Sequence, residues 1–337
     1  MSEESPEERS ARIRTLDTAP VELNGGLPDD EALPALAVLQ AEGLGAIPAL
    51  GLDGRPAELI LRGYTPGDRA AIEVRLSDPG SSRFAIKVYA GDPAPEAELY
   101  MALAGAGLAS GNGVRVPRLL AWDAALKLVV LEWLEGLPLN DVVKEGPPER
   151  AGELGARWLH CAASLPVRLG PPHGPARVIS ESGRFIDMLE DGDPALGSAG
   201  RTVIESLSEH LPRESAPHLV HGTLYTRHLI DMEGHGAGGL GVIDWQRSGQ
   251  GPLELDAGTF LATLSRTGLL RNRRVSDVDR AETAFRAETS ALLDERAVAW
   301  YEAAALLRLA GRMLRRRPPA KAVPLLEQAA RLAAAAR

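Results

Sequence analysis

The apolar pattern of this chain changes near residue 135 from strand-like to helix-like, and this change limits the possible folds more than any other feature. Before it, residues 58–62, 70–76 and 83–89 alternate apolar and polar side chains and are rich in β-branched residues, which favours β-strands. The stretches 64–68 and 78–82 between them contain Pro-Gly pairs typical of tight turns. The sequence therefore predicts a three-stranded antiparallel meander.

Most of the chain after the meander is predicted to be helical. A helical segment at about 95–109 precedes two more strands, of which the second covers 127–134, and residues 135–139 break the pattern. Residues 218–245 are predicted to be loop and strand, and the Pro-, Gly- and Ser-rich stretch 166–199 is predicted to be an irregular insertion. The expected helices are 31–43, 148–164, 200–211, 253–266, 278–292, 295–316 and 320–336.

These elements predict an α+β fold with three regions. Residues 1–30 are polar and acidic and are expected to form a mobile tail. Residues 31–135 form a small N-terminal lobe of antiparallel strands with one helix, and residues 136–337 form a larger, mainly helical C-terminal lobe.

Composition excludes several classes of protein. The formal net charge is -9, so no basic field would attract a nucleic acid backbone. No window is apolar over the roughly 18–20 residues that a membrane span needs, and the acidic start lacks the features of a signal peptide. Cys161 is the only cysteine, so an intrachain disulfide is impossible. We therefore expect a cytoplasmic protein whose partners are small molecules or other proteins.

Several segments, in their order along the chain, resemble the aminoglycoside phosphotransferase and choline-kinase-like family, which has a bilobal protein-kinase-like fold. The resemblance runs from about residue 58 to 265. It rests on residues 83–89, 96–103, 116–120, 128–136, 219–230 and 241–245. It implies an ATP-dependent small-molecule kinase that uses Mg²⁺ or Mn²⁺, with the catalytic-loop region at 218–245.

In the N-terminal lobe, the resemblance assigns nucleotide binding to five residues. Lys87 would supply positive charge to the α- and β-phosphates, which the loose transition state of phosphoryl transfer requires. By itself it reads as a solvated lysine on a strand, and the flanking motifs reverse that interpretation. Glu96 would pair with this lysine, with Glu98 as a second candidate, although either fits the first turn of a helix. Gly67 would offer a backbone contact to the phosphates, and the segment 128–136 assigns Glu132 and Trp133 to the nucleotide side.

In the C-terminal lobe, Asp244 follows an apolar run and has the character of a ligand for a hard cation. The alternative is a helix cap or a turn aspartate. The resemblance implies that Asp256 braces the catalytic loop and that His221 holds this loop structurally.

The chain departs from the family pattern at two positions of that loop. The family has His-Gly-Asp followed five residues later by an Asn metal ligand, and here Thr223 and His228 replace the Asp and the Asn. Neutral imidazole can bind a divalent ion, so His228 is a metal ligand or a phosphate contact. A threonine hydroxyl is too weak to act as a general base, whose loss costs about 10²–10⁴ in rate. Nearby substitutes are Asp231, His221 and Glu254.

Two functions therefore remain open. One is a slow phosphotransferase that acts on a hydroxyl of a sugar, an antibiotic or a peptide side chain. The other is a catalytically dead pseudokinase that serves as a partner or scaffold subunit in a biosynthetic pathway. Residues 244–247 also resemble lipopolysaccharide sugar kinases. The expected lining of the acceptor site is Tyr225, Arg227, Glu254 and Trp300, while the basic run 315–317 is more simply a helix C-terminus.

Overall fold

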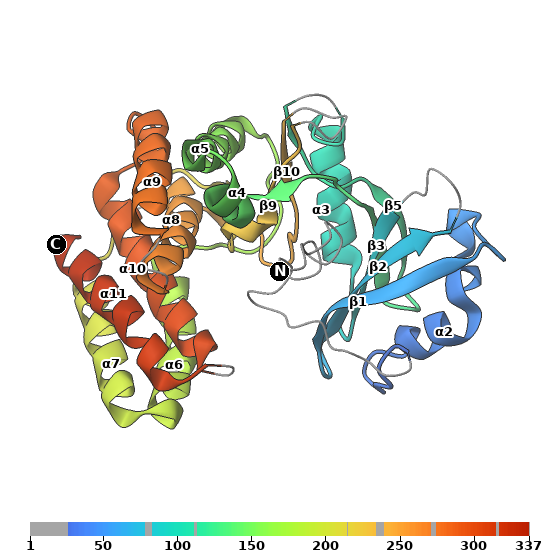
Figure 1. Ribbon diagram of the computed structural model, residues 1–337, viewed down its shortest axis with the longest axis horizontal. Coiled ribbons are helices and arrows are strands. Elements are labelled where there is room, and N and C mark those ends of the chain that lie inside the picture. Colours follow the sequence, from blue (N-terminus) through green and yellow to red (C-terminus); the bar gives the residue numbers. More distant parts are fainter. Residues whose placement is uncertain are drawn as a thin grey trace, which may run out of the picture. The chain divides into compact units, whose positions relative to one another are not determined.

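The chain divides into two compact units, which are shown in the computed structural model of Figure 1. The first unit contains Met1–Ala109 and Val116–Leu134, and the second contains Ser110–Arg115 and Glu135–Arg337. The structure describes residues 26–77, 83–110, 113–213, 215–233, 239–270, 274–314 and 317–336. The predicted α+β class is confirmed, because an antiparallel sheet dominates the first unit and helices dominate the second.

The first unit is built on a five-stranded antiparallel sheet with the order β1-β2-β3-β6-β5. The meander predicted from residues 58–89 forms its first three strands, although the turn at 78–82 lies outside the described residues. The strands are β1 (Ala57–Thr65), β2 (Arg69–Leu76), β3 (Arg83–Tyr89), β5 (Leu119–Asp123) and β6 (Leu128–Glu132).

Two helices use different faces of this sheet. Leu36 and Leu39 of α2 (Ala35–Glu42) share a buried core with Ile86 and Val88 of β3. Side chains alternate along a strand, so Lys87 points to the opposite face, where α3 (Ala94–Gly105) supplies its partner. The short helices η1 (Gly43–Ala46) and η2 (Pro48–Leu50) follow α2.

The expected N-terminal tail lies mostly outside the described residues, and its last residue is ordered. The Asp30 carboxylate accepts hydrogen bonds from the Tyr64 hydroxyl at 2.9 Å and from the Gly67 N–H at 2.8 Å. These bonds lower the pKa of Asp30. Residue 30 therefore belongs to the folded unit, because its carboxylate caps the turn between β1 and β2.

The second unit consists mainly of helices that pack on one another. Among the most extensively packed helix pairs are α5 with α9, α8 with α10 and α10 with α11. Gly152 of α5 permits one of these approaches, because a Cβ there would lie 2.1 Å from the Ala281 carbonyl oxygen of α9. None of the helices in the described ranges combines the length and apolar character needed to cross a membrane. The helices are α4 (Leu139–Glu145), α5 (Pro148–Ser164), α6 (Pro175–Gly192), α7 (Pro194–Glu209), α8 (Leu253–Leu270), α9 (Val275–Thr289), α10 (Glu295–Met313), η5 (Pro319–Lys321) and α11 (Val323–Ala335).

Two small sheets in the second unit carry the loop at 221–228. One has the order β4-β10-β9-β7 and the other pairs β11 with β8. The loop leaves β8 and reaches β9 through the short helix η3 (Thr226–His228). The strands are β4 (Val114–Arg115), β7 (Leu137–Pro138), β8 (His218–Val220), β9 (Leu229–Asp231), β10 (Leu240–Val242) and β11 (Gly249–Gly251).

The prediction of an irregular insertion at 166–199 is wrong. Residues 175–192 form α6, and α7 begins at Pro194, six residues before the expected start of that helix. Both prolines stand in the first turn, where their missing N–H is not needed. The glycines are contact points: a Cβ at Gly197 would lie 2.7 Å from the Glu190 Cβ. Tertiary packing against α10 therefore overrides weak helix propensity.

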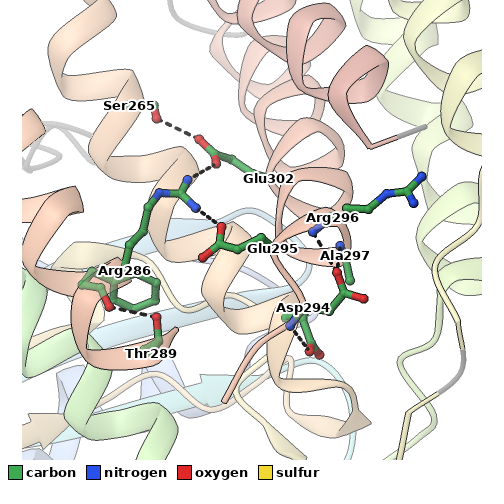
Figure 2. A network of polar contacts seen from close by, with 10 residues as sticks. Ser265, Arg286, Thr289, Asp294, Glu295, Arg296, Ala297 and Glu302 are labelled. Atoms are coloured by element: carbon green, nitrogen blue, oxygen red, sulfur yellow. Dashed lines mark hydrogen bonds and ion pairs between the residues drawn. The ribbon is translucent and has the colours of Figure 1, made fainter. Parts of the chain in front are cut away.

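A polar network joins α8, α9 and α10 (Figure 2). The Ser265 hydroxyl lies 2.9 Å from the Glu302 carboxylate. It also lies 3.0 Å from the Glu282 carboxylate. Arg286 of α9 pairs with Glu295 and, at 3.5 Å, with Glu302. Burial is the main cause that raises the pKa of Glu302 to about 7, and it also raises the pKa of Glu282. Because one hydroxyl has one proton, both contacts to Ser265 form only when one carboxyl is protonated.

Candidate active site

The first unit places a buried lysine against a carboxylate. The Lys87 ammonium on β3 lies 2.9 Å from Oε1 of Glu96, in the first turn of α3, and both side chains are about nine-tenths buried. The other oxygen of Glu96 accepts a hydrogen bond from the Tyr89 hydroxyl at 2.5 Å. Burial raises the pKa of Tyr89, so this phenol stays protonated as a donor. The carboxylate is thus fixed from two sides and holds Lys87 in one position.

Gly67 lies in the turn between β1 and β2, where its φ of 69° falls in the left-handed region that favours glycine. Its N–H donates to Asp30, as described above. A phosphate oxygen can accept from this N–H only after the Asp30 carboxylate leaves. The structure therefore gives Gly67 an acidic partner from its own unit.

Glu132 and Trp133 follow one another at the end of β6, and both contact arginines. Glu132 accepts from the Nε atom of Arg118 at 3.3 Å, and the Arg83 guanidinium lies 5.1 Å from the centre of the Trp133 ring. The backbone N–H of Glu132 donates to the Arg118 carbonyl. These contacts fix the end of the strand.

In the second unit, Asp256 of α8 holds the start of the loop at 221–228. Its carboxylate accepts from the backbone N–H of His221 at 2.7 Å and of Gly222 at 2.9 Å, and from the Trp158 indole at 3.3 Å. Asp256 is completely buried, and this burial raises its pKa above the ordinary value despite these donors. The bonds fix the backbone of the loop, which is the bracing role expected for Asp256.

His221 is oriented by the strand-end residues that follow β10. Its Nε2 atom donates to the Ile243 carbonyl at 2.8 Å, so in the neutral imidazole the Nδ1 atom carries the lone pair. The Thr223 hydroxyl lies 3.5 Å from this Nδ1 atom. Thr223 is buried, with 7% of its surface exposed. The hydroxyl at position 223 therefore faces an imidazole acceptor.

His228 and Asp244 form the pair with the chemistry of a metal site. Nδ1 of His228 donates to the Thr223 carbonyl at 2.8 Å, which leaves the lone pair on Nε2, and this atom lies 3.4 Å from Oδ2 of Asp244. Burial, more than any other cause, lowers the pKa of His228 well below its usual value, so the imidazole is neutral. A neutral nitrogen and a carboxylate oxygen at this separation can bind one divalent cation.

Asp244 combines a strained backbone conformation with a partly exposed carboxylate, as residues at functional sites often do. Its φ is 70°, a left-handed conformation that is uncommon outside glycine, and its side chain is 40% exposed. The adjacent Trp245 is buried, and its indole donates to the Val242 carbonyl at 3.0 Å. Within the described ranges, no cluster of three or more His, Cys, Asp and Glu side chains surrounds a metal position. Mg²⁺ commonly keeps water and substrate phosphates as its remaining ligands.

The four residues expected to line an acceptor site lie in different environments. Tyr225 packs its ring on His228, with centroids 5.1 Å apart, and the Arg227 guanidinium lies 4.6 Å from the Tyr225 ring. Glu254 is buried and accepts from the backbone N–H of Asp294 at 3.2 Å. Trp300 is 1% exposed and donates to the Leu207 carbonyl inside the hydrophobic core. The expected lining role of Trp300 is therefore wrong, because its helical face is the one that packs on α7.

The three substitute bases also differ. Asp231 forms a bidentate ion pair with Arg150, which lowers its pKa although burial alone would raise it. Glu254 is engaged at the start of α10. His221 is the one of the three for which the structure gives a contact with Thr223.

Sequence reasoning did not single out three residues that shape these sites. Tyr89 stands two positions after Lys87 and therefore lies on the same face of β3. The alternation of side chains along this strand could have identified it. Trp158 of α5 and Arg308 of α10 come from distant helices, and no local pattern points to them.

The fold is that of the kinase-like phosphotransferase class. The phosphotransferase enzyme family matches residues 73–285, which is more than half of the chain. The chain therefore belongs to this family, as the sequence resemblance predicted. Among curated proteins, no sequence matches the chain significantly.

Solved structures show the same fold at low sequence identity. A thermostable mutant of the aminoglycoside phosphotransferase APH(4)-Ia is 14% identical with a TM-score of 0.59, and covers 82% of this chain and 94% of its own. An aminoglycoside phosphotransferase from Streptomyces rimosus is 19% identical with a TM-score of 0.53, over 84% of this chain and 99% of its own. An ethanolamine kinase from Plasmodium vivax is 12% identical with a TM-score of 0.53, over 91% and 95%.

Proposed function

We propose that this protein binds ATP with Mg²⁺ or Mn²⁺ and transfers the γ-phosphoryl group slowly to a hydroxyl acceptor. The observation that carries the proposal is the pair His228 and Asp244, whose lone pair and carboxylate lie 3.4 Å apart. A divalent cation held there would neutralise the charge of the triphosphate. Lys87, fixed by Glu96 and Tyr89, would supply a second positive charge.

Thr223 accounts for the low rate in this proposal. Its hydroxyl is buried beside Nδ1 of His221, in place of the carboxylate that orients the acceptor hydroxyl in the family. Because the transition state of phosphoryl transfer is loose, positioning and charge contribute more than proton removal. His221 Nδ1 could accept a proton through the Thr223 hydroxyl. The chain would therefore keep slow turnover.

The decisive experiment compares nucleotide binding and turnover. Thermal shift with ATP and Mn²⁺ or Mg²⁺ reports binding, and ADP release with water as the acceptor reports basal turnover. We expect the wild type to bind ATP in a metal-dependent way and to release ADP slowly, and Asp244→Ala to lose both. Absence of binding at millimolar ATP and metal would rule out the proposal.

A second function is favoured by the same threonine. If ADP release is absent in the wild type and appears only in Thr223→Asp, the protein is a nucleotide-binding pseudokinase. Its role would then be that of a partner or scaffold subunit. The buried position of Thr223 supports this alternative, because a buried hydroxyl has little access to an acceptor.

A further inference from the structure

The loop that carries Thr223 continues to Tyr225, whose ring is contacted by two arginines. Tyr225 is 3% exposed, its ring packs on His228, and guanidinium groups lie 4.6 Å (Arg227) and 5.5 Å (Arg308) from its ring centre. Within the described residues its buried hydroxyl has no hydrogen-bond partner. A buried phenol without a partner costs free energy, so a ligand that accepts a hydrogen bond from it would remove this cost.

Arg308, on α10, is the second group whose hydrogen-bonding atoms are unused. Its Nε and Nη2 atoms are buried and have no hydrogen-bond partner in the part of the chain that the structure describes. An arginine carries its charge at every physiological pH, and burying that charge without an acceptor is costly. Arg308 and the Tyr225 hydroxyl therefore present unused donors in one neighbourhood, because the Arg308 guanidinium lies 5.5 Å from the Tyr225 ring centre.

Four arginines act electrostatically on the Tyr225 phenol. Burial raises the pKa of Tyr225, but Arg308, Arg312, Arg227 and Arg266 outweigh it and lower the pKa overall. Arg247 lies three residues after Asp244, and its pKa is lowered first by burial and then by Arg308, Arg184 and Arg177, against the opposing effect of Glu181.

One carboxylate serves several of these arginines. Glu181 of α6 pairs with Arg177 at 2.9 Å, with Arg184 at 3.4 Å and with Arg247. Three cations thus share the carboxylate of Glu181. An anionic ligand would relieve the mutual repulsion of Arg247 and Arg308.

We propose that the acceptor of this phosphotransferase carries an oxyanion, bound by Arg308 and Arg247 beside Tyr225. The oxyanion belongs to a phosphate ester or a carboxylate, and the hydroxyl that receives the phosphoryl group lies on the side of His228. Cationic acceptors such as amino sugars are repelled by this cluster. The acceptor role rests on the proposed function, whereas binding of the anion does not.

Anion binding is measured on the full-length protein by calorimetry and thermal shift at constant ionic strength set with chloride. The probes are inorganic phosphate, glucose 6-phosphate, gluconate, glucose and glucosamine. We expect phosphate and at least one of the two anionic sugars to bind, and glucose and glucosamine not to bind. Preference for glucose 6-phosphate over gluconate identifies a phosphate ester, and the reverse identifies a carboxylate.

Arg308→Met keeps the aliphatic packing and removes the charge, and it should weaken phosphate binding roughly 10- to 100-fold. Arg308→Lys, which keeps the charge, should recover part of the affinity if Arg308→Met folds poorly. The matched control is Arg280→Met, an exposed arginine of α9 paired with Glu149, which should leave affinity unchanged. Equal affinity in wild type and Arg308→Met would overturn the proposal.

A competition experiment distinguishes phosphate binding at an acceptor site from phosphate binding at the nucleotide site. Phosphate that still binds when ATP and Mn²⁺ are saturating supports the acceptor site. Phosphate that ATP displaces overturns the assignment, because the arginines would then hold the triphosphate. If ATP does not bind but phosphate does, the proposed function fails while the anion site stands.

Discussion

Nε2 of His228 lies 3.4 Å from Oδ2 of Asp244, and the His228 proton is held on the opposite nitrogen by the Thr223 carbonyl. The imidazole therefore presents its lone pair toward the carboxylate. A nitrogen and an oxygen ligand suit Mn²⁺ better than Mg²⁺, which prefers oxygen alone. This relationship leads to the first prediction.

Metal preference should follow residue 228. The wild type should gain more stability from ATP with Mn²⁺ than with Mg²⁺, and His228→Asn should shift the preference toward Mg²⁺. Asp244→Ala should weaken metal-dependent ATP binding beyond the ~10- to 100-fold that loss of an outer-shell partner causes. Calorimetric titration of ATP at fixed metal measures both effects. An unchanged Mn²⁺ to Mg²⁺ ratio in His228→Asn would show that His228 is not a ligand.

Restoring an aspartate at position 223 should restore rate. Thr223→Asp should raise ADP release about 10²- to 10⁴-fold, because a carboxylate replaces a hydroxyl that cannot act as a base. Steady-state turnover at saturating ATP checks this. Asparagine has the same size as aspartate but no basic oxygen, so Thr223→Asn should not raise the rate of ADP release. Equal gains in both variants would point to access rather than to proton transfer.

Loss of the Lys87 charge should act on ATP binding as well as on folding. Lys87→Met leaves the buried Glu96 without its cation, which should cost about 1–3 kcal/mol of stability. Lys144→Met breaks the ion pair of Lys144 with Asp141, whose side chains are similarly buried, and serves as the control. Both variants should unfold at lower denaturant concentration. Only Lys87→Met should weaken ATP binding.

The Tyr225 phenol should report the state of the arginine cluster. Its pKa is lowered by the surrounding arginines in spite of burial, whereas the pKa values of Tyr64, Tyr89 and Tyr301 are raised. Absorbance at alkaline pH should therefore show an early phenolate signal that Tyr225→Phe removes. Arg308→Met or bound phosphate should move this signal to higher pH, because each removes positive charge. A signal that responds to neither would show that the arginines do not act on Tyr225.

Stability should fall as pH rises through the titration of Glu302 (Figure 2). Its folded pKa of about 7 exceeds the ordinary value of 4.5, mainly through burial, so the folded state binds more protons between these values. Linkage then predicts a loss on the order of 2–3 kcal/mol between pH 5 and pH 8. Glu302→Gln should flatten this dependence in chemical denaturation across that range. A parallel pH profile in both proteins would refute the role of Glu302.

Much of the fold could be predicted because its signals are local. The strand alternation of β1 to β3 and the long apolar periodicity of α5 and α8 are properties of single segments. Helix α6 was not predicted although Ser182, Phe185 and Leu189 of its buried face recur at helical spacing, because the Pro, Gly and Ser content of 166–199 outweighed this signal. Trp300 is a different case, because local sequence cannot distinguish a core tryptophan from a pocket residue.

The candidate site likewise has residues that local sequence identifies and residues that only the fold brings together. Lys87, Glu96 and Asp244 occur in short segments whose residue types match the family, so the sequence singles them out. The Arg308 and Arg247 neighbourhood depends on side chains from α6, α10 and the segment after β10, which meet only after folding. The Asp30 bond to Gly67 spans 37 residues and is invisible in either local segment.

The backbone of the loop at 221–223 is held by Asp256 and by the bond from His221 to the Ile243 carbonyl, whereas the Thr223 side chain adds one long contact. The hydrogen bonds that hold this loop thus do not involve the side chain at residue 223. A lineage could lose or regain a catalytic base here without passing through an unfolded protein. A designer could therefore exchange the reactive group at residue 223 while keeping the backbone conformation of the loop.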